Sequence, residues 1–421
     1  MEFTRFGQKM TSNAGILSLM DDLGKATACG SRPMIMMGGG NPGRVPEFQE
    51  IMRRRLLAIC EDRQVFQRLI GGYAPPQGEK TFVESLAALL RKEQGWDVGP
   101  ENICLTNGSQ TAFFMLFNLF AGLMPDGRLK KICLPMAPEY IGYADLGLTE
   151  GLFVTTRPEI ELLNGGFFKY HIDFNRLEVG EDIGVICISR PTNPTGNVVT
   201  DGELARLIAL AAERQIPLII DSAYGLPFPG MVYSTAKPVW NDNLIVCLSL
   251  SKLGLPAVRT GIVVARPEVV QALTAMNAIM SLTPTNFGAM LAEHIVETGE
   301  IIGLGRDLIQ PFYQAKMENA VAVVREQFST VPCRIHKPEG AMFLWLWFED
   351  LPITSLELYR LLKEHGVLVV SGHYFFPGLG GDWKHKDECI RVTYSQGDED
   401  VRRGLEIIAG VVRRIYETKG D

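Results

Sequence analysis

Lys252 is the first residue whose type and position could do chemistry. It follows the apolar run 244–249, which predicts a β-strand, and it closes the tetrapeptide Ser-Leu-Ser-Lys. In open α/β folds, ligands bind outside the carboxyl ends of the parallel strands. A neutral amine at that edge could attack a carbonyl compound. Taken alone, a strand-end lysine also fits a solvated or ion-paired surface residue.

Asp221 is the second such residue, and it ends the apolar run 217–221, Pro-Leu-Ile-Ile-Asp. Burying a carboxylate in these surroundings is costly unless a cation meets it. A protonated pyridine nitrogen would be such a partner, and its protonation would make a cofactor ring an electron sink. The alternative is an aspartate that caps the turn after the strand.

A candidate anion site lies in the turn 107–110, Asn-Gly-Ser-Gln, between a predicted strand and an apolar helix. The backbone N–H groups and the Ser109 hydroxyl would form a cradle at the N-terminus of the helix, which begins near Gln110. The flexibility of Gly108 would allow this turn. Such a cradle can hold a phosphate monoester. An ordinary capped turn is the alternative.

The loop 189–197, Ser-Arg-Pro-Thr-Asn-Pro-Thr-Gly-Asn, follows another predicted strand. Its two prolines fix the backbone, so that Asn193 presents an amide at the sheet edge. Asn193 precedes Asp221 by 28 residues, and Asp221 precedes Lys252 by 31. Three strand-end side chains at these spacings are far more specific than any single turn.

The elements that must position these residues form an alternating pattern. From about residue 79 to 270, helical patterns alternate with short β-rich runs, which is typical of a parallel sheet with crossover helices. One helix begins with a capping box, Thr200 with Glu203, in which each residue satisfies a free N–H of the other. The predicted strands are 103–106, 131–134, 184–189, 217–221, 244–249 and 261–265.

The pattern changes after about residue 300. A long helix (304–328), an apolar strand (341–348), a helix (354–365), strands near 367 and 390, and a closing helix from 398 are predicted. We interpret this part as a smaller α+β domain. The predicted division is an N-terminal arm with part of the small domain (1–48), a large cofactor-binding domain (49–305) and a small C-terminal domain (306–421).

Together these motifs resemble the fold-type-I pyridoxal-phosphate aminotransferases, and the resemblance covers essentially the whole chain. It implies an α/β fold of the aspartate-aminotransferase type: a large domain with a three-layer, mostly parallel sheet, and a smaller α+β domain. It implies that Lys252 forms the Schiff base with pyridoxal 5'-phosphate and shuttles the proton. Asp221 would meet the pyridine nitrogen, and Tyr224 would meet the cofactor's phenolate oxygen beside Asn193.

The same resemblance implies the remaining site residues. Tyr140 would stack on the cofactor ring, and Ser249 and Arg259 would contact the phosphate. Tyr73 resembles a tyrosine that reaches the phosphate of the other subunit, which implies a homodimer with shared active sites. The cofactor-binding set is Gly108, Ser109, Gln110, Tyr140, Asn193, Asp221, Tyr224, Ser249, Lys252, Arg259 and Tyr73, and the substrate-binding set is Gly40, Asn193 and Arg391.

Arg391 is the expected partner of the substrate carboxylate, because a planar two-pronged donor suits a carboxylate better than a lysine does. Between residues 267 and 305 there is neither lysine nor arginine. Relatives that act on dicarboxylates carry a side-chain arginine in about this region, so small apolar amino acids fit better. Four stretches (105–122, 137–145, 249–256 and 336–354) resemble members that transfer the amino group between valine and pyruvate in a ping-pong reaction, giving 2-oxoisovalerate and alanine.

The sequence also fits other functions. The same residues serve lyases, decarboxylases and aminotransferases with other substrates. The run 38–43, Gly-Gly-Gly-Asn-Pro-Gly, satisfies the glycine pattern of nicotinamide dehydrogenases, but Pro42 lacks an N–H that a pyrophosphate would need. A transcription-regulator module would need an attached DNA-binding domain. We expect no role for nucleic acid. His373 could be a site residue or a structural histidine.

Composition limits the remaining possibilities. The 421 residues are 46% hydrophobic and 21% charged, with a net charge of -7, so neither nucleic acid nor an anionic membrane is an expected partner. The eight cysteines are scattered singly, which predicts no metal site. No apolar run is long enough to predict a membrane span. We therefore expect a cytoplasmic enzyme with reduced, buried thiols.

Overall fold

A computed structural model describes residues 2–11, 17, 24 and 34–418 of the chain. Its larger sheet has the strand order β2-β11-β10-β9-β8-β4-β3, with β5 paired to β4. The pairs among β10, β9, β8, β4 and β5 are parallel, whereas β11 and β3 run antiparallel to their neighbours. The strands are β2 (Ile103–Thr106), β3 (Gly122–Leu123), β4 (Leu129–Leu134), β5 (Phe153–Thr155), β8 (Ile183–Ser189), β9 (Leu218–Asp221), β10 (Leu244–Ser249) and β11 (Gly261–Val264). The mostly parallel sheet confirms the prediction.

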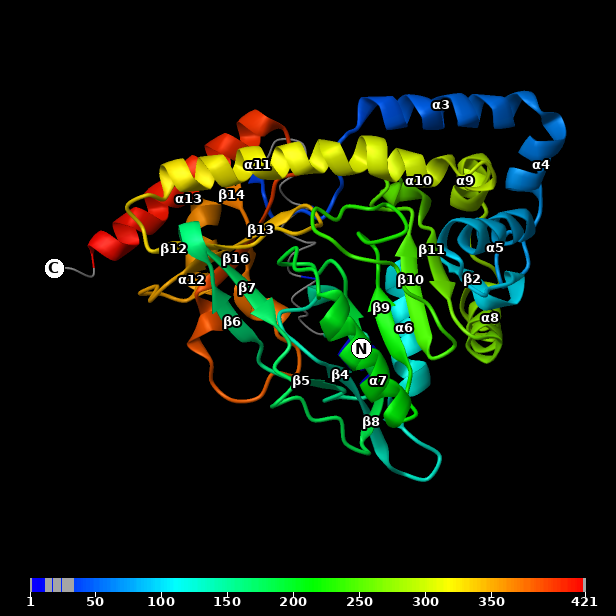
Figure 1. Cartoon of the computed structure of the whole chain (residues 1–421), viewed down its shortest axis with the longest axis horizontal. Coiled ribbons are helices and arrows are strands. Elements are labelled where there is room, and N and C mark those ends of the chain that lie inside the picture. The colour runs from blue at the N-terminus through cyan, green and yellow to red at the C-terminus, as the bar shows by residue number, and fades with distance from the viewer. Residues whose placement is uncertain (1, 12–16, 18–23, 25–33, 419–421) are drawn as a thin grey trace.

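The central strands are apolar throughout because helices cover both faces of the sheet. Every residue of β9 and β10 is buried. Helix α7 covers the near face in Figure 1, and α6 lies behind the sheet. The helices are α1 (Arg5–Met10), α3 (Pro46–Glu61), α4 (Arg63–Gly71), α5 (Lys80–Gln94), α6 (Ser109–Phe120), α7 (Asp201–Glu213), α8 (Pro267–Ser281), α9 (Phe287–Glu297), α10 (Glu300–Leu304), α11 (Gln310–Gln327), α12 (Ser355–Glu364) and α13 (Asp398–Glu417). The sheet and its two helical layers give the expected three-layer arrangement.

The capping box of α7 is formed as predicted. The Thr200 hydroxyl accepts a hydrogen bond from the Glu203 N–H at 3.1 Å, and the Glu203 carboxylate accepts one from the Thr200 N–H at 2.9 Å. Two N–H groups of the first turn are thereby satisfied. This fixes where the loop after β8 ends and the crossover helix begins.

A six-stranded sheet packs beside the first, in the strand order β15-β16-β13-β12-β7-β6. Its strands are β6 (Glu159–Leu162), β7 (Phe167–His171), β12 (Cys333–His336), β13 (Phe343–Phe348), β15 (Val370–Ser371) and β16 (Cys389–Thr393). The hairpin β6–β7 comes from the middle of the chain, and β7 pairs in parallel with β12. The sequence patterns left this hairpin unassigned. The predicted domain boundary near residue 305 stays a prediction.

A long helical segment joins the two sheets. Helices α10 and α11 are continuous through a π-helical turn, Gly305–Ile309, and together they cross the top of the molecule in Figure 1. This agrees with the helix predicted over 304–328. Gly305 lies against the loop after β9, where a Cβ atom would stand 2.7 Å from the carbonyl oxygen of Pro229. A larger residue there would push the helix away from that loop.

The N-terminal segment reaches the second sheet through a short parallel pair, β1 (Ile35–Met36) with β14 (Val367–Leu368). This pair positions the glycine run that follows β1 near the junction of the two sheets. Within the described residues, no helix is long and apolar enough to span a membrane.

Candidate active site

A cavity of about 690 Å³ opens at the carboxyl ends of the central strands. Strand register explains its position, since Ser189 at the end of β8 pairs with Asp221 at the end of β9, and Asp221 pairs with Cys247 on β10. The predicted residues that line the cavity are Gly40, Ser109, Gln110, Tyr140, Asn193, Asp221, Tyr224, Ser249, Lys252, Arg259 and Arg391. Side chains far apart in sequence therefore meet at one sheet edge, as the spacing predicted.

Lys252 projects into this cavity from the turn after β10. Its Nζ donates to the carbonyl oxygen of Gly40 at 2.7 Å and lies 5.2 Å from the ring centre of Tyr224. Burial lowers the pKa of Lys252 to about 8, and the charges of Arg391 and Arg259 act in the same direction. A larger fraction of this amine is therefore neutral near pH 7 than of an ordinary lysine.

Asp221 is 9% exposed and accepts two hydrogen bonds. The Tyr143 hydroxyl donates to one carboxylate oxygen at 2.6 Å, and the N–H of Ala223 donates to the other at 2.9 Å. Burial raises the pKa of Asp221, while these hydrogen bonds and the charge of Lys252 oppose that rise. The sequence analysis does not identify Tyr143, because this residue belongs to no recognisable motif. Its only signal is its position three residues after the stacking candidate Tyr140.

The predicted anion cradle lies at the N-terminus of α6. Helix α6 begins at Ser109, after Gly108 with a φ of 87°, a backbone conformation that favours glycine. The Arg259 guanidinium packs against this glycine so closely that a Cβ atom would lie 2.1 Å from Nη2. Free N–H groups of a helix N-terminus and an arginine thus face the same space.

Two side chains near the cradle make specific local contacts. The amide of Gln110 donates to the carbonyl oxygen of Gly142 at 2.9 Å, which ties α6 to the turn that carries Tyr140. The Ser249 hydroxyl accepts a hydrogen bond from the Ser251 N–H at 3.1 Å. Gln110 therefore supports the cavity wall through its side chain.

Arg391 is a buried cation that lacks a carboxylate partner within the described residues. It is 2% exposed and lies 4.2 Å from the ring centre of Phe343. Its Nη1 donates to the Asn193 side-chain oxygen and its Nη2 to the Gly38 carbonyl, both at 2.7 Å, while its Nε is buried without a hydrogen-bond partner. Burial lowers the pKa of Arg391 to about 10. A buried guanidinium of this kind calls for an anion beside it.

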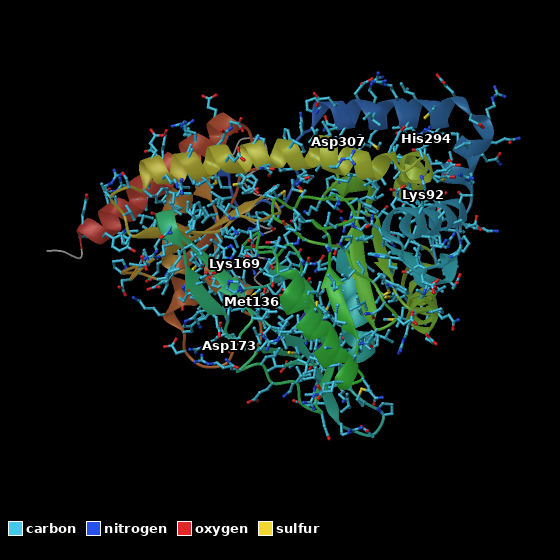
Figure 2. All side chains as sticks on the ribbon, in the orientation of Figure 1. Lys92, Met136, Lys169, Asp173, His294 and Asp307 are labelled. Atoms are coloured by element: carbon cyan, nitrogen blue, oxygen red, sulfur yellow. The ribbon has the colours of Figure 1, made fainter. Side chains whose placement is uncertain are left out.

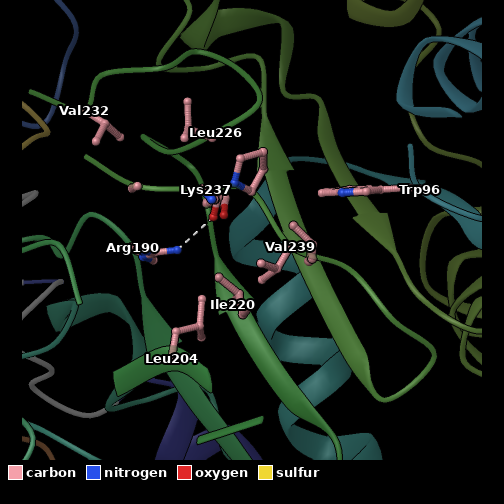
Figure 3. A pocket seen from close by; sticks show the side chains of 12 residues that line it. Trp96, Arg190, Leu204, Ile220, Leu226, Val232, Lys237 and Val239 are labelled. Atoms are coloured by element: carbon pink, nitrogen blue, oxygen red, sulfur yellow. Dashed lines mark hydrogen bonds between the residues drawn. The ribbon is translucent and has the colours of Figure 1, made fainter. Parts of the chain in front are cut away.

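Arg190, two residues before Thr192 in the same loop, points away from the cavity. Its guanidinium donates to the carbonyl oxygens of Val199 and Lys237, at 2.7 and 3.0 Å, and pairs with Asp201. Arg190 and Lys237 border a separate hollow of about 20 Å³ (Figure 3). The hollow has room for roughly one water molecule. Arg190 therefore anchors the loop and does not face the cavity.

A buried ion pair holds the other side of this loop. Lys169 on β7 pairs with Glu339 and donates to the Asn197 side chain at 2.9 Å and to the Val198 carbonyl at 3.1 Å. The Asn197 amide also contacts the sulfur of Met136, and Lys169 and Met136 lie in the interior in Figure 2. The second sheet thereby fixes the loop that carries Asn193.

Other candidates fall outside the cavity. Tyr73 is 84% exposed and borders a separate hollow with Gly72 and Asn286. His373 contacts the Ser371 hydroxyl through Nδ1 at 2.7 Å and does not line the cavity. The carbonyls of Gly38 and Gly40 accept hydrogen bonds from the cavity's cations. The strand before the glycine run, β1, forms a separate two-stranded sheet with β14, so the run lacks the βαβ context of a dinucleotide site.

Comparison with known proteins gives one consistent result. The family model for aminotransferase class I and II matches residues 61–408. The valine–pyruvate aminotransferase of Escherichia coli K12 is 49% identical over 416 residues, covering 99% of each chain. The crystal structure of valine–pyruvate aminotransferase from Salmonella typhimurium superposes with a TM-score of 0.88 at 47% identity, covering 96% of this chain and 99% of that one. Aspartate aminotransferase from Thermus thermophilus, at 20% identity and a TM-score of 0.78, shares the fold.

The pKa of Lys252 can be measured on the ligand-free protein. Trace labelling of amines with acetic anhydride across a pH series, read by mass spectrometry, should show half-maximal reaction of Lys252 near pH 8, against the ordinary lysine value of 10.5. Replacing Arg391 by Met should move this midpoint upward, because the arginine's charge helps to lower it. A midpoint shared with surface lysines would contradict the assignment.

Proposed function

Because the chain belongs to the class I and II aminotransferases, we propose that it exchanges the amino group between valine and pyruvate, giving 2-oxoisovalerate and alanine. The observation that carries the proposal is the meeting of Lys252, Asp221 and Arg391 in one cavity. An amine, a buried carboxylate and a buried guanidinium are the groups that this reaction needs. The full-length similarity to valine–pyruvate aminotransferases supports the choice of substrates.

Enzymes of this family use pyridoxal 5'-phosphate, and the cavity fits it. When bound, this cofactor supplies an aldehyde that condenses with amines and a ring that withdraws electrons from the α-carbon. Lys252 would hold it covalently, the Gly108–Ser109 turn and Arg259 would hold its phosphate, and Tyr140 would pack on its ring. The buried Asp221 would face its ring nitrogen. The steric limit at Gly108 supports this fit, because a side chain there would displace Arg259.

Lys252 moves the proton in the proposed mechanism. Its Nζ must be neutral to take a proton from the substrate Cα, and the lowered pKa of about 8 increases the neutral fraction near pH 7. The carbonyl of Gly40 holds the amine in position through a hydrogen bond of 2.7 Å. Lys252 is thus oriented as well as activated.

Arg391 would bind the substrate carboxylate. Two of its nitrogens are held by Asn193 and Gly38, so its plane is fixed before a substrate arrives. A carboxylate would satisfy its unpartnered Nε and neutralise its charge. The α-amino group of the same substrate would then lie on the side of the cavity that holds Lys252.

The rest of the cavity wall suits a small apolar side chain. Among the described lining residues, the basic ones are Lys252, Arg259 and Arg391, and each already has a role in this mechanism. Apolar positions of the wall include Met36, Phe113, Ile141 and Pro256. A side-chain carboxylate would find no further cation among the described lining residues, and its burial would be costly.

We also propose a homodimer with shared active sites. Large apolar side chains are exposed around the hollow that holds Tyr73, and Asn286 donates to the Gly72 carbonyl, which brings two segments of this surface together. The exposed fractions are 65% for Ile70, 84% for Tyr73, 86% for Ile279 and 60% for Leu282. Exposed apolar patches of this kind are typical of protein interfaces. Tyr73 would reach the partner's cofactor phosphate.

A cytoplasmic location is proposed from the thiols. Cys104, Cys133, Cys187 and Cys247 are free and buried in the first sheet. Burial raises the pKa of the Cys104 thiol, which keeps it in the unreactive protonated form. Such thiols are typical of proteins that function in reducing surroundings.

Donor preference tests the substrate. With pyruvate as acceptor and 2-oxo acid formation as readout, valine should exceed aspartate in kcat/KM by about 100-fold, because aspartate would bury an unpaired carboxylate. The Lys252→Ala variant supplies the baseline without catalysis. Aspartate turned over better than valine would overturn the substrate assignment.

Substitution of Arg391 tests carboxylate binding. Arg391→Lys should raise the KM for valine about 100-fold, since it loses a charge-assisted two-pronged contact of roughly 2–3 kcal/mol. Arg402→Lys, an exposed arginine on α13, is the matched control and should keep the KM of the wild type. An unchanged KM in Arg391→Lys would remove this residue from the site.

Shared sites can be tested by mixing inactive subunits. Lys252→Ala and Tyr73→Ala chains, unfolded and refolded together, should form mixed dimers in which one site carries both substitutions and the other none. Activity of the mixture should exceed the mean of the two parent dimers. Activity equal to that mean, with sedimentation showing dimers, would place Tyr73 outside the partner's site.

A further inference from the structure

Glu139 is a fully buried carboxyl group that the proposed mechanism does not use. It is 0% exposed, and no lysine or arginine of the described residues pairs with it. Both of its oxygens face Ser189 at the end of β8, at 2.9 Å from the backbone nitrogen and 2.5 Å from the hydroxyl. A carboxyl group buried without a cation must be stabilised by hydrogen bonds or by remaining protonated.

The contacts continue from Ser189 to the candidate cofactor site. The Ser189 hydroxyl lies 3.3 Å from the Tyr143 hydroxyl, which in turn donates to Asp221 at 2.6 Å. Ser189 is 2% exposed and Tyr143 is 0% exposed, so both links of this chain are buried. Four side chains from three segments therefore form one line of hydrogen bonds that ends on the Asp221 carboxylate.

The number of available protons determines which group donates in each hydrogen bond of this line. Tyr143 has one hydroxyl proton and gives it to Asp221. If Glu139 is ionised, Ser189 must give its only proton to Glu139, and the Ser189–Tyr143 contact is left with two acceptor oxygens. If Glu139 is protonated, it donates to Ser189, Ser189 donates to Tyr143, and each contact has one proton. The opposite direction, from a protonated Asp221 through Tyr143 and Ser189 to an ionised Glu139, would also give each contact one proton. With Asp221 ionised, as the proposed function requires, the protonated Glu139 is the state that satisfies the whole chain.

The surrounding charges favour the same state. Burial raises the pKa of Glu139 to about 8, and the nearby charge of Asp221 adds to this rise. The other titratable groups that face it are the Tyr143 phenol and the Cys187 thiol, whose pKa values burial raises, so both remain neutral. The proposed function requires Asp221 to be the ionised carboxyl group. Burial raises its pKa, while the hydrogen bonds from Tyr143 and Ala223 and the charge of Lys252 oppose that rise.

We propose that Glu139 is a positioning residue which, as a neutral acid, begins a one-way hydrogen-bond chain through Ser189 and Tyr143 that holds Asp221 ionised toward the cofactor ring. The inference rests on the role of Asp221 in the proposed function. Glu139 touches neither the substrate nor the cofactor in this assignment. Its effect reaches the ring nitrogen only through the three hydrogen bonds of the chain.

Two substitutions of Glu139 distinguish a role as a neutral hydrogen-bond donor from a role as a charged carboxylate. Glu139→Gln keeps a neutral hydrogen-bond donor toward Ser189, whereas Glu139→Leu keeps the size and removes the donor. The dissociation constant of pyridoxal phosphate from the apoprotein, followed by its absorbance, should stay within about 2-fold of wild type in Glu139→Gln and rise about 10-fold in Glu139→Leu. Equal weakening in both variants, or none in Glu139→Leu, would overturn the proposal.

Thermal unfolding of the apoprotein gives a test without cofactor. The folded pKa of Glu139, about 8, lies above its ordinary 4.5, so its stabilising neutral form is complete below pH 4.5 and is lost as the pH rises to about 8. Glutamine does not titrate. The Tm of Glu139→Gln minus that of wild type should therefore grow from pH 5 to pH 8 and then level off. A difference independent of pH would show that Glu139 is ionised throughout.

Tyr143→Phe removes the last link of the chain. Loss of its hydrogen bond should raise the pKa of Asp221, so that cofactor binding falls away at a higher pH on acidification than in wild type. Tyr170→Phe is the matched control, because it removes a buried hydroxyl that contacts His385 and Trp345 in the second sheet. Its cofactor affinity should keep the wild-type pH dependence. If the wild-type protein does not bind pyridoxal phosphate, the proposed function is refuted. If Tyr143→Phe binds it with the wild-type pH dependence, only the proposed hydrogen-bond chain is refuted.

Discussion

The register in which β8, β9 and β10 pair near their carboxyl ends is the constraint on which the site depends. Parallel pairing places Ser189 beside Asp221 and continues to Cys247, so that the loops after these strands leave the sheet at one edge. A shift of one residue in any of these pairs would turn the Asp221 side chain to the opposite face of the sheet. The buried apolar faces of the strands oppose such a shift. The catalytic geometry is therefore set by the same packing that stabilises the sheet.

The charges of the cavity follow from this geometry. Lys252, Arg259 and Arg391 line it, and Asp221 is the acidic residue among the described lining residues. Burial, together with the charges of Arg391 and Arg259, lowers the pKa of Lys252. The excess of positive charge suits a phosphate together with a substrate carboxylate. Burial raises the pKa of Asp221 and the charge of Lys252 opposes that rise, so a protonated ring nitrogen beside this carboxylate would favour its ionised form. The cavity is therefore prepared for two anions before either of them binds.

The sequence predicts the site residues that follow strand ends, but it does not reveal those that are placed by tertiary contacts. Lys252, Asp221 and Asn193 follow apolar runs whose ends are visible in the sequence. Tyr143 and Glu139 flank the stacking candidate within one turn, and nothing in their local sequence indicates that they meet Ser189 and Asp221. The hairpin β6–β7 was missed because β6 exposes Glu159 and Glu161 and lacks a buried apolar face. Such features depend on contacts between distant segments, which a single sequence does not specify.

The two sheets must also stay at a fixed distance from each other, because Arg391 lies on β16 in one sheet and Lys252 follows β10 in the other. Asn193 links the sheets directly by accepting a hydrogen bond from Arg391. Gly38 and Gly40, which follow β1, accept hydrogen bonds from Arg391 and Lys252, so that one short segment contacts both cations. Carbonyl groups can hold two cations near each other without neutralising them, whereas carboxylates in the same place would compete with the substrate. The glycine run therefore sets the spacing of the two cations and leaves their charge available to a ligand.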